Sequence, residues 1–267
     1  MQNKSERIAD LLAGILTVLV LCVLYTPVAI SALFSVVEIK DGHILWDSFT
    51  LQHYVTLWSN PTVIDSLKNT AIVAGTSVFF ATILAVGFAL YVEWQGAVGK
   101  RTLELAIYLP FLLPPIVTGL SLLVASAQFD VSRGLTTIII GHTIFVLAVA
   151  YRLILTRLQT LPRTMIEASS DLGATRLQTF RFIVLPYMTS AIATGAVLAL
   201  TLSFDETLIS VFLAGDRMTL PLRLWAMMRV GFTQQINALV TIVLMISLIL
   251  ATAVAFRLKL GNQLNTE

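Results

Sequence analysis

Long apolar runs separated by short polar segments make up most of the chain. Charge-free windows able to cross about 30 Å of hydrocarbon as helices occupy residues 11–34, 71–92, 105–129, 182–204 and 236–256. A sixth run, residues 135–151, is slightly short and contains His142, and it continues past Arg152 if that side chain snorkels. The pattern predicts an all-α membrane protein with six transmembrane helices.

Composition indicates that the bilayer is the solvent of this chain. Hydrophobic residues make up 57% of the 267 residues and charged residues 12%, whereas a soluble domain has about 25% charged residues. The formal net charge of +2 is too small to indicate a nucleic-acid partner. Cys22 is the single cysteine, so neither an intrachain disulfide nor a metal site is expected. The first apolar run exceeds the about 7–15-residue core of a cleavable signal, which predicts a retained anchor.

Positive charges indicate the orientation of the chain. With the N-terminus in the cytoplasm, the inner segments carry the larger share of lysine and arginine, as the positive-inside rule requires. Six spans then place both termini in the cytoplasm. The expected outer segments are residues 38–66, where Trp46, Tyr54 and Trp58 suit an interfacial helix, and a tight turn at residues 130–134. Residues 157–181 form the longest inner segment.

This inner segment predicts two short helices around a glycine. Pro162 can open the first helix, because its missing N–H would be unpaired there, or Thr164 and Glu167 can form a capping box two residues later. Gly173 tolerates the left-handed conformation that ends a helix, and Pro186 separates the second helix from the next span or kinks the junction. The expected apolar stripes consist of Leu161, Met165, Ala168 and Leu172, then of Leu177, Phe180 and Val184. The pattern alone is also compatible with a loop that rests on its own bundle.

Two places inside the apolar runs are candidates for a solute pathway. Pro110, Pro114 and Pro115 predict a broken helix near the middle of the membrane, where irregular backbone is tolerated only against protein or a water-filled cavity. A purely structural kink is the alternative. Asp205 and Glu206 have apolar sequence on both sides, so they either face water or a cation in a pathway or form a charged outer mouth without a ligand role.

Other polar groups in these runs have simpler interpretations. His142 is more often a satisfied interhelical donor than a ligand, and Asn69 and Asn237 are expected to make interhelix hydrogen bonds. Gly215 to Arg217 predicts a turn, and residues 220–230 predict a short amphipathic helix that returns toward the last span.

The inner segment resembles a signature of a known family. Glu167, Ala168 and Ser169 are followed by Gly173 six residues after the glutamate, and by Ile183, Leu185 and Pro186. This spacing resembles the motif of permease subunits of binding-protein-dependent, type I ABC importers, with Ser169 where the usual form has alanine. The resemblance implies a single permease domain over residues 1–267, in the bacterial cytoplasmic (inner) membrane, with a coupling segment at about 157–186 between helices 4 and 5.

The resemblance also implies partners and a division of labour. In this family the coupling helix sits in a cleft of an ATP-hydrolysing subunit, and Glu167, Ala168, Ser169, Gly173, Ile183, Leu185 and Pro186 are the corresponding coupling residues here. The complete importer also contains a second homologous permease, two cytoplasmic ATPases and an extracytoplasmic binding protein. The chain has no phosphate-binding loop, so it is not an enzyme, and ATP and Mg are expected on the ATPase subunits.

Further positions resemble the spermidine/putrescine branch of these permeases. The similar segments are Ser203 to Glu206, Ala214 and Gly215, Thr219 to Pro221, and Ile236 to Leu239. The resemblance implies a cationic solute, with Ser203, Asp205, Glu206, Pro114 and Pro115 along its pathway. Pro115 stands where many polyamine permeases have aspartate, so an amino-acid derivative or an opine-like solute remains an alternative. An ion-coupled secondary transporter and a non-transporting membrane sensor or scaffold are alternatives from other classes.

Overall fold

The computed structural model describes residues 4–40, 43–94, 96–231 and 234–263. The chain forms two compact units. The smaller unit comprises Met1–Pro61 with Leu224–Ile246, and the larger comprises Thr62–Arg223 with Ser247–Glu267.

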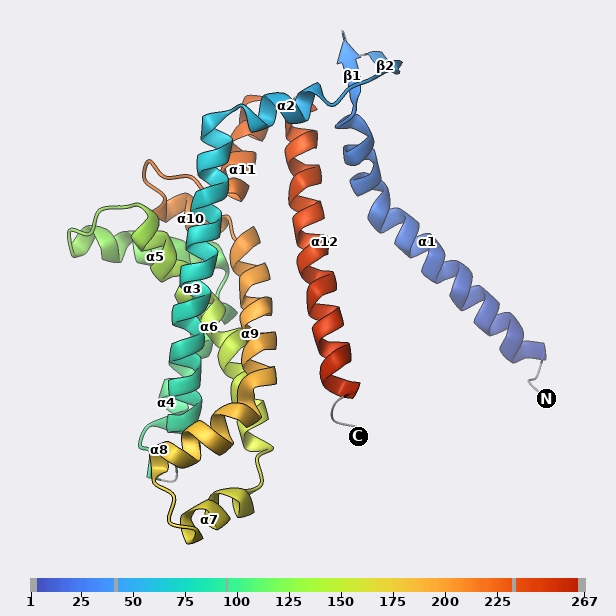
Figure 1. The fold of residues 1–267 in the computed structure, drawn as a ribbon. Coiled ribbons are helices and arrows are strands. Elements are labelled where there is room, and N and C mark those ends of the chain that lie inside the picture. Colours follow the sequence, from blue (N-terminus) through green and yellow to red (C-terminus); the bar gives the residue numbers. More distant parts are fainter. Residues whose placement is uncertain (1–3, 41–42, 95, 232–233, 264–267) are drawn as a thin grey trace. The chain divides into compact units, whose positions relative to one another are not determined.

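The smaller unit starts with one long apolar helix. Helix α1 (Lys4–Phe34) leads into an antiparallel hairpin of β1 (Val37–Lys40) and β2 (His43–Phe49), which is followed by α2 (Gln52–Trp58) (Figure 1). The hydroxyls of Ser35 and Tyr54 lie 2.6 Å apart and join the end of α1 to α2. The expected helix in residues 38–66 is therefore present, but Trp46 lies on a strand that the sequence analysis did not predict.

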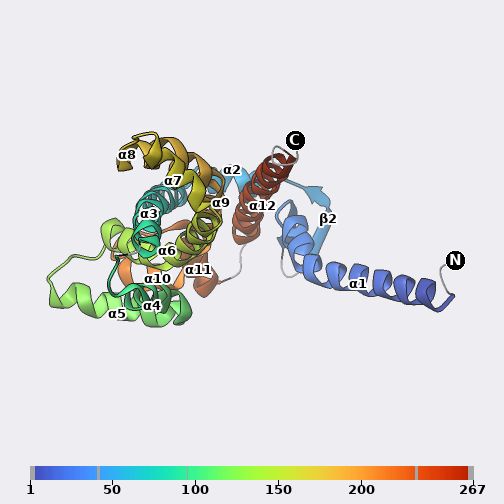
Figure 2. The same ribbon diagram turned by 90° about the horizontal axis from the view of Figure 1, so that it is seen from below.

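The larger unit is a bundle of helices around α6, as Figures 1 and 2 show. Its elements, with the two helices that follow them in the chain, are α3 (Pro61–Glu93), α4 (Lys100–Leu112), α5 (Pro115–Gln128), α6 (Leu135–Gln159), α7 (Arg163–Asp171), α8 (Arg176–Thr179), η1 (Phe180–Val184), α9 (Leu185–Asp205), α10 (Leu208–Leu213), α11 (Leu220–Val230) and α12 (Gln234–Gln263).

Small side chains let the long helices of this bundle approach closely. Ala81, Ala85 and Ala89 lie one turn apart on α3 and are fully buried. On α9, a Cβ built on Gly195 would lie 3.4 Å from the Cα of Ala150 on α6. Larger residues such as Tyr151 fill the remaining space. Packing of this kind is what stabilises helices in a bilayer, where lipid tails are as apolar as leucine.

The long helices account for most of the predicted spans. Four described helices are long and apolar enough to cross a membrane, namely Asp10–Phe34, Pro61–Glu93, Leu135–Gln159 and Arg176–Asp205, and the bent pair α4 and α5 makes a fifth if it is one span. Within α12, Gln234–Ile249 forms a shorter apolar stretch. The expected extension of the short run past Arg152 is confirmed, because α6 continues to Gln159. Six spans remain a prediction.

Candidate functional site

Helices α7 and α8 form a small excursion at one end of the larger unit, below the long helices in Figure 1. Pro162 precedes α7 with an extended backbone (φ −61°, ψ 126°), and no side chain caps the helix there. The helix thus begins directly after the proline, and the capping box of Thr164 and Glu167 does not form. Gly173 takes φ +78° and ends the turn as predicted, because left-handed backbone suits glycine.

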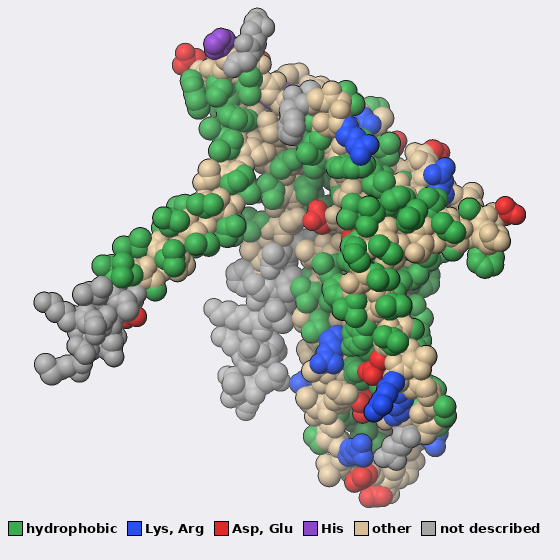
Figure 3. Space-filling view, turned by 180° about the vertical axis from the view of Figure 1, so that it is seen from behind, with side chains coloured by type: hydrophobic (Ala, Val, Ile, Leu, Met, Phe, Trp, Pro, Cys, Tyr) green, Lys and Arg blue, Asp and Glu red, His purple; other side chains and the backbone are tan. Residues whose placement is uncertain are grey.

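Much of the apolar surface of this excursion is exposed. Leu161 is buried, but Leu172 and Leu177 are 89% and 74% exposed, and Phe182 is exposed as well. Glu167 and Ala168 are also exposed. Charged side chains gather at the same end of the unit, whereas the middle of the bundle is mainly hydrophobic (Figure 3). These apolar groups therefore project from the polar end of the unit, beyond its hydrophobic middle.

Ser169 has a different environment from its neighbours. It is only 6% exposed, its hydroxyl donates to the carbonyl of Ile166 at 2.7 Å, and it lies 2.9 Å from the hydroxyl of Thr179. The structure therefore places this serine between α7 and α8, where a hydroxyl makes a link that the alanine of the usual motif cannot make. Glu167 and Ala168 remain on the exposed side.

The return segment is one continuous helix and not two. A capping box opens α8: Gln178 N–H donates to the side chain of Thr175, and Thr175 N–H donates to the side chain of Gln178. Helix α8 continues through the π-helical turn η1 into α9. Of the two alternatives for Pro186, separation of the helices is therefore wrong, whereas the helix does change direction between α8 and α9, as Figure 1 shows. Pro186 cannot donate to the carbonyl of Phe182, and the wider turn just before it accommodates its ring without a break.

The remaining predicted coupling residues lie on this return segment. Ile183 and Leu185 are half-buried and Pro186 is exposed. The guanidinium of Arg157 stacks 4.1 Å from the ring centre of Tyr187 and donates to its carbonyl, so the end of α6 is fixed to the start of α9.

A cleft of about 380 Å³ lies beside α7. Glu93 of α3, Gln159 of α6, and Arg163 and Glu167 of α7 line it, over a floor that includes Leu158 and Leu161. The amide of Gln159 donates to the carboxylate of Glu93 at 3.0 Å. Arg163 and Glu167 make no ion pair with each other among the described residues, although they lie one helical turn apart on α7.

The first interrupted span bends by 109° between α4 and α5. The predicted break is confirmed, with Leu113 extended (ψ 147°) and Pro115 at the first position of α5. Pro114 has no N–H to donate to the carbonyl of Pro110, four residues earlier. The hydroxyl of Thr118 donates to that carbonyl instead, at 3.2 Å. Pro114 is exposed and Pro115 is half-buried.

A second interruption carries the two acids. Helix α9 ends at Asp205, Glu206 is extended (ψ 114°), and α10 begins at Leu208. The carboxylate of Glu206 accepts from the N–H of Ile209 at 3.0 Å and so caps α10. Asp205 is exposed, whereas Glu206 is half-buried. The structure thus separates two acids that the sequence could not distinguish.

The two interruptions lie close together. Gly119 of α5 packs against α10, where an added Cβ would lie 3.1 Å from the Cα of Ile209 and 2.9 Å from the ring of Phe212. Ser203, predicted in the solute pathway, is buried in the same region and lies 2.8 Å from Nδ1 of His142. His142 is a satisfied interhelical group, as expected.

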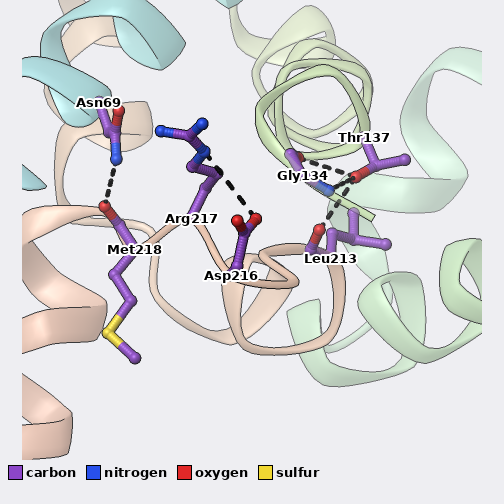
Figure 4. Close-up of polar contacts among 7 residues, drawn as sticks. All are labelled: Asn69, Gly134, Thr137, Leu213, Asp216, Arg217 and Met218. Carbon is purple, nitrogen blue, oxygen red and sulfur yellow. Dashed lines mark hydrogen bonds and ion pairs between the residues drawn. The ribbon is translucent and has the colours of Figure 1, made fainter. Parts of the chain in front are cut away.

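Residues 213–220 form a loop at the other end of the unit, and both of its ends are hydrogen-bonded to neighbouring helices (Figure 4). The carbonyl of Leu213 accepts from Gly134 N–H and from the Thr137 hydroxyl, each at 2.9 Å. At the other end, the amide of Asn69 donates to Met218, and Leu220 N–H donates to the hydroxyl of Thr70. The predicted turn is present, with Gly215 at φ +60°, and α11 confirms the predicted amphipathic helix.

Several hydrogen bonds in these sites were not predicted from the sequence. The pattern Thr-x-x-Gln at residues 175–178 is a capping-box signature. The pairing of Thr118 with Pro110, and that of His142 with Ser210, had no local signal because each depends on the tertiary fold.

The fold and these sites define an integral membrane protein of the helical-bundle class with two interrupted helices. The chain belongs to the family of binding-protein-dependent transport system inner membrane components, whose model matches residues 77–260. It is therefore a permease subunit of an ABC importer, not itself an enzyme, and an inner-membrane protein.

Curated relatives and solved structures agree with this assignment. The spermidine/putrescine transport system permease protein PotC of Escherichia coli (strain K12) is 31% identical over 92% of this chain and 93% of its own length. The putrescine transport system permease protein PotI of the same strain is 33% identical over 83% and 81%. A bacterial ABC transporter involved in the import of the acidic polysaccharide alginate matches with a TM-score of 0.70 at 17% identity, over 97% of this chain and 96% of that one. The fold is therefore that of type I ABC transporter permeases.

Proposed function

We propose that this chain is one of two permease subunits through which an ATP-driven importer moves a small cationic solute, a polyamine or a related amine. An extracytoplasmic binding protein delivers the solute, and two cytoplasmic ATPases, which bind ATP and Mg, drive the transport cycle. The observation that carries the proposal is the exposed excursion of α7 and α8, which presents Glu167, Ala168 and uncovered apolar side chains on a chain of this family.

The excursion has the properties of a docking element for the ATPase. Leu172 and Leu177 are large apolar groups outside the hydrophobic middle of the bundle, where water would otherwise surround them. An exposed apolar patch among polar residues is typical of a protein interaction site. The cleft next to it adds Glu93 and Glu167, whose carboxylates suit a basic side chain of the partner.

Charge supports a cytoplasmic position for this end. Arg157, Arg163, Arg176 and Arg181 all lie in or beside the excursion, and positive residues accumulate on the inner side of bacterial membrane proteins. Both termini are then cytoplasmic if six helices span the bilayer. A homologous second permease would complete the pathway.

The solute assignment rests on Asp205 and on the two interruptions. Asp205 is an exposed carboxylate at the C-terminal end of α9, where the helix dipole adds partial negative charge. Interrupted helices commonly build transporter binding sites, and Pro114, Pro115, Ser203 and Glu206 lie at these two interruptions. A cation is the chemistry that this arrangement favours. The names of PotC and PotI support a polyamine as the solute. Because Pro115 stands where many polyamine permeases have aspartate, other small amines should be tested as well.

Delivery by a binding protein is supported by one solved relative. The alginate transporter, 16% identical to this chain with a TM-score of 0.70, has been solved in complex with an alginate pentasaccharide-bound periplasmic protein. The loop of residues 213–220 faces the end of the unit opposite α7 (Figure 1) and is a suitable receptor contact on the outer side.

Reconstitution tests the proposal. The permease pair, the ATPase and the binding protein would be placed in proteoliposomes with radiolabelled putrescine or spermidine. Uptake should require ATP, should stop when the phosphate-binding lysine of the ATPase is replaced, and should persist with an uncoupler. If the uncoupler stops uptake and replacement of the ATPase lysine does not change it, the chain would instead be an ion-coupled secondary transporter. A complex that assembles but moves none of a panel of amines and amino-acid derivatives would contradict the solute assignment.

A further inference from the structure

We propose that His142 is a positioning residue of the solute pathway: its ring ties together the two sides of the interruption that carries Asp205 and Glu206. This inference rests on the proposed function only where it concerns the solute. Its structural part, the orientation of the two acids, concerns this chain alone.

The geometry of the tie is simple. His142 lies on α6 and is only 1% exposed. Its Nδ1 lies 2.8 Å from the hydroxyl of Ser203, in the last turn of α9, and its Nε2 lies 2.9 Å from the hydroxyl of Ser210, on α10. Ser203 precedes Asp205 by two residues, and Ser210 follows Glu206 by four. One side chain on a third helix therefore holds both flanks of the break.

Imidazole suits this role for a chemical reason. A neutral ring has one N–H donor and one acceptor nitrogen, and a serine hydroxyl can either donate or accept. Because the Ser210 hydroxyl donates to the carbonyl of Glu206, it accepts from Nε2–H, and Nδ1 then accepts from the Ser203 hydroxyl, so both ring nitrogens are satisfied. Satisfaction matters here because an unpaired polar group in a buried membrane helix has no water to replace the missing partner.

The two serine contacts of His142 are needed because few backbone hydrogen bonds fix the angle between α9 and α10. Interruption of the helix removes the hydrogen bonds that would run from α10 to α9. Helix α10 has only six residues, which is too short to be stable without packing. Its links near the break are the capping carboxylate of Glu206, the bond from the Ser210 hydroxyl to the carbonyl of Glu206, 3.4 Å away, and the bond from the Thr207 hydroxyl to the carbonyl of Asp205, 3.3 Å away.

Helix α6 also packs closely against α10 next to His142. Gly141, next to His142, leaves room for two α10 side chains: an added Cβ would lie 2.7 Å from Ile209 Cγ2 and 2.8 Å from Leu213 Cδ1. The close seating fixes the position of α10, and the two serine contacts fix its angle to α9. Glu206 then turns toward Ile209 N–H, and Asp205 remains exposed for a cation.

Thiol labelling tests the orientation without any need for transport. In a Cys22→Ser background, Asp205→Cys reports the accessibility of position 205, and Asp216→Cys, on the exposed loop, is the reference. The probe is a positively charged, membrane-impermeant thiosulfonate applied to the purified full chain. The thiol at position 205 should label readily with His142 present. When His142→Phe, which keeps an aromatic ring and loses both contacts, is added, the rate at position 205 should fall about tenfold, with no change at position 216.

Two variants separate positioning from general packing. His142→Gln has an amide that can donate and accept, and it should restore much of the labelling rate. Thr143→Val removes a neighbouring buried hydroxyl that bonds Ile139 on α6, and it should leave labelling at position 205 unchanged. An unchanged rate at this position in folded His142→Phe would overturn the proposal, as would failure of Asp205→Cys to label in the protein with His142.

Uptake assays add a second readout. With the binding protein as the varied component and putrescine as the probe, His142→Phe should raise the half-saturating concentration about tenfold and leave the maximal rate within about twofold. A loss of maximal rate without any labelling change would contradict positioning. If the unmodified complex shows no uptake but His142→Phe still lowers the labelling rate at position 205, the proposed function is wrong. The positioning role of His142 would then remain supported.

Discussion

The hydroxyl of Thr118 donates to the carbonyl of Pro110, 3.2 Å away, across the 109° bend between α4 and α5. This bond replaces the one that Pro114 cannot make, because proline has no N–H. A threonine one turn into the second half-helix thus stabilises the interruption that three prolines create.

Removal of this hydroxyl should destabilise the bend. Thr118→Val keeps the branched shape but leaves the Pro110 carbonyl without its donor, and we expect a loss of about 1–3 kcal/mol in unfolding free energy. Denaturant titration of the purified chain in detergent measures it. Thr118→Ser keeps the hydroxyl and is the matched control, so equal losses in the two variants would mean that the hydrogen bond is not responsible.

Exposed apolar groups of the excursion should be needed for binding to the ATPase. Leu172→Arg places a charge on a side chain that is 89% exposed, so the fold should survive, whereas co-purification of the ATPase should fall at least about tenfold. Glu167→Arg should act in the same direction. Phe129→Arg, a comparably exposed apolar site after α5, is the control. Normal recruitment of the ATPase by Leu172→Arg and Glu167→Arg would rule out docking at α7.

Gly173→Trp tests the shape of the same element. The φ of +78° at Gly173 is rarely adopted by other residues, so this variant should shift α8 relative to α7 at a cost of about 1–3 kcal/mol. Membrane insertion should be unaffected, and ATP-driven uptake should be lost. Protease mapping of the excursion would report the shift, and an unchanged cleavage pattern with full uptake would contradict the prediction.

Asp205 and Glu206 should differ when they are replaced one at a time. Asp205→Asn removes an exposed charge, so uptake of a cationic solute should weaken about tenfold or more. Glu206→Gln keeps an oxygen that can accept from Ile209 N–H, so its effect should be smaller, whereas Glu206→Leu should lose the cap and about 0.5–2 kcal/mol of stability. Concentration-dependent uptake and thermal unfolding give the two readouts. Equal uptake by Asp205→Asn and the unmodified protein would remove Asp205 from the pathway.

Gly215→Ala should loosen the loop of residues 213–220. The φ of +60° disfavours alanine, and its Cβ would lie 2.9 Å from the carbonyl oxygen of Arg133. We expect a loss of about 1–3 kcal/mol and a weaker stimulation of ATP hydrolysis by the binding protein, with basal hydrolysis retained. Gly134→Ala is the control, because nothing lies within 4 Å of its added Cβ. Equal stimulation in both variants would exclude a role for this loop in receptor contact.

Local sequence patterns were enough to predict some of these features. The proline cluster at residues 110–115 fixes a break because proline acts on its own turn, and Gly173 and Gly215 mark left-handed backbone. The β-hairpin at residues 37–49 was missed although Asp41 and Gly42, a common hairpin dipeptide, separate two runs of β-forming residues. The aromatic residues Trp46, Tyr54 and Trp58 made a membrane-surface helix the competing interpretation.

Other features depend on contacts that local patterns cannot contain. Pro186 looks like a helix boundary, but helical backbone continues through it, because the π-helical turn just before it accommodates the ring. Ser169 looks like a small surface residue until Thr179 folds back onto it. The different environments of Asp205 and Glu206 follow from where α10 starts, which is determined by α5 and α6 and not by the neighbouring sequence.

Because helical backbone continues from Arg176 to Asp205, the excursion and the exposed carboxylate sit at opposite ends of one lever. Figure 1 shows a bend between α8 and α9, so the straight part is α9, whose 21 residues measure about 31 Å. A tilt of about 5° at its lower end would displace Asp205 by about 3 Å. The Ser169–Thr179 contact connects α7 to the start of this long helix. The π-helical turn between α8 and α9 is the place where the long helix can bend. A displacement of α8 would thus be transmitted through continuous helix to Asp205 without passing through any loop.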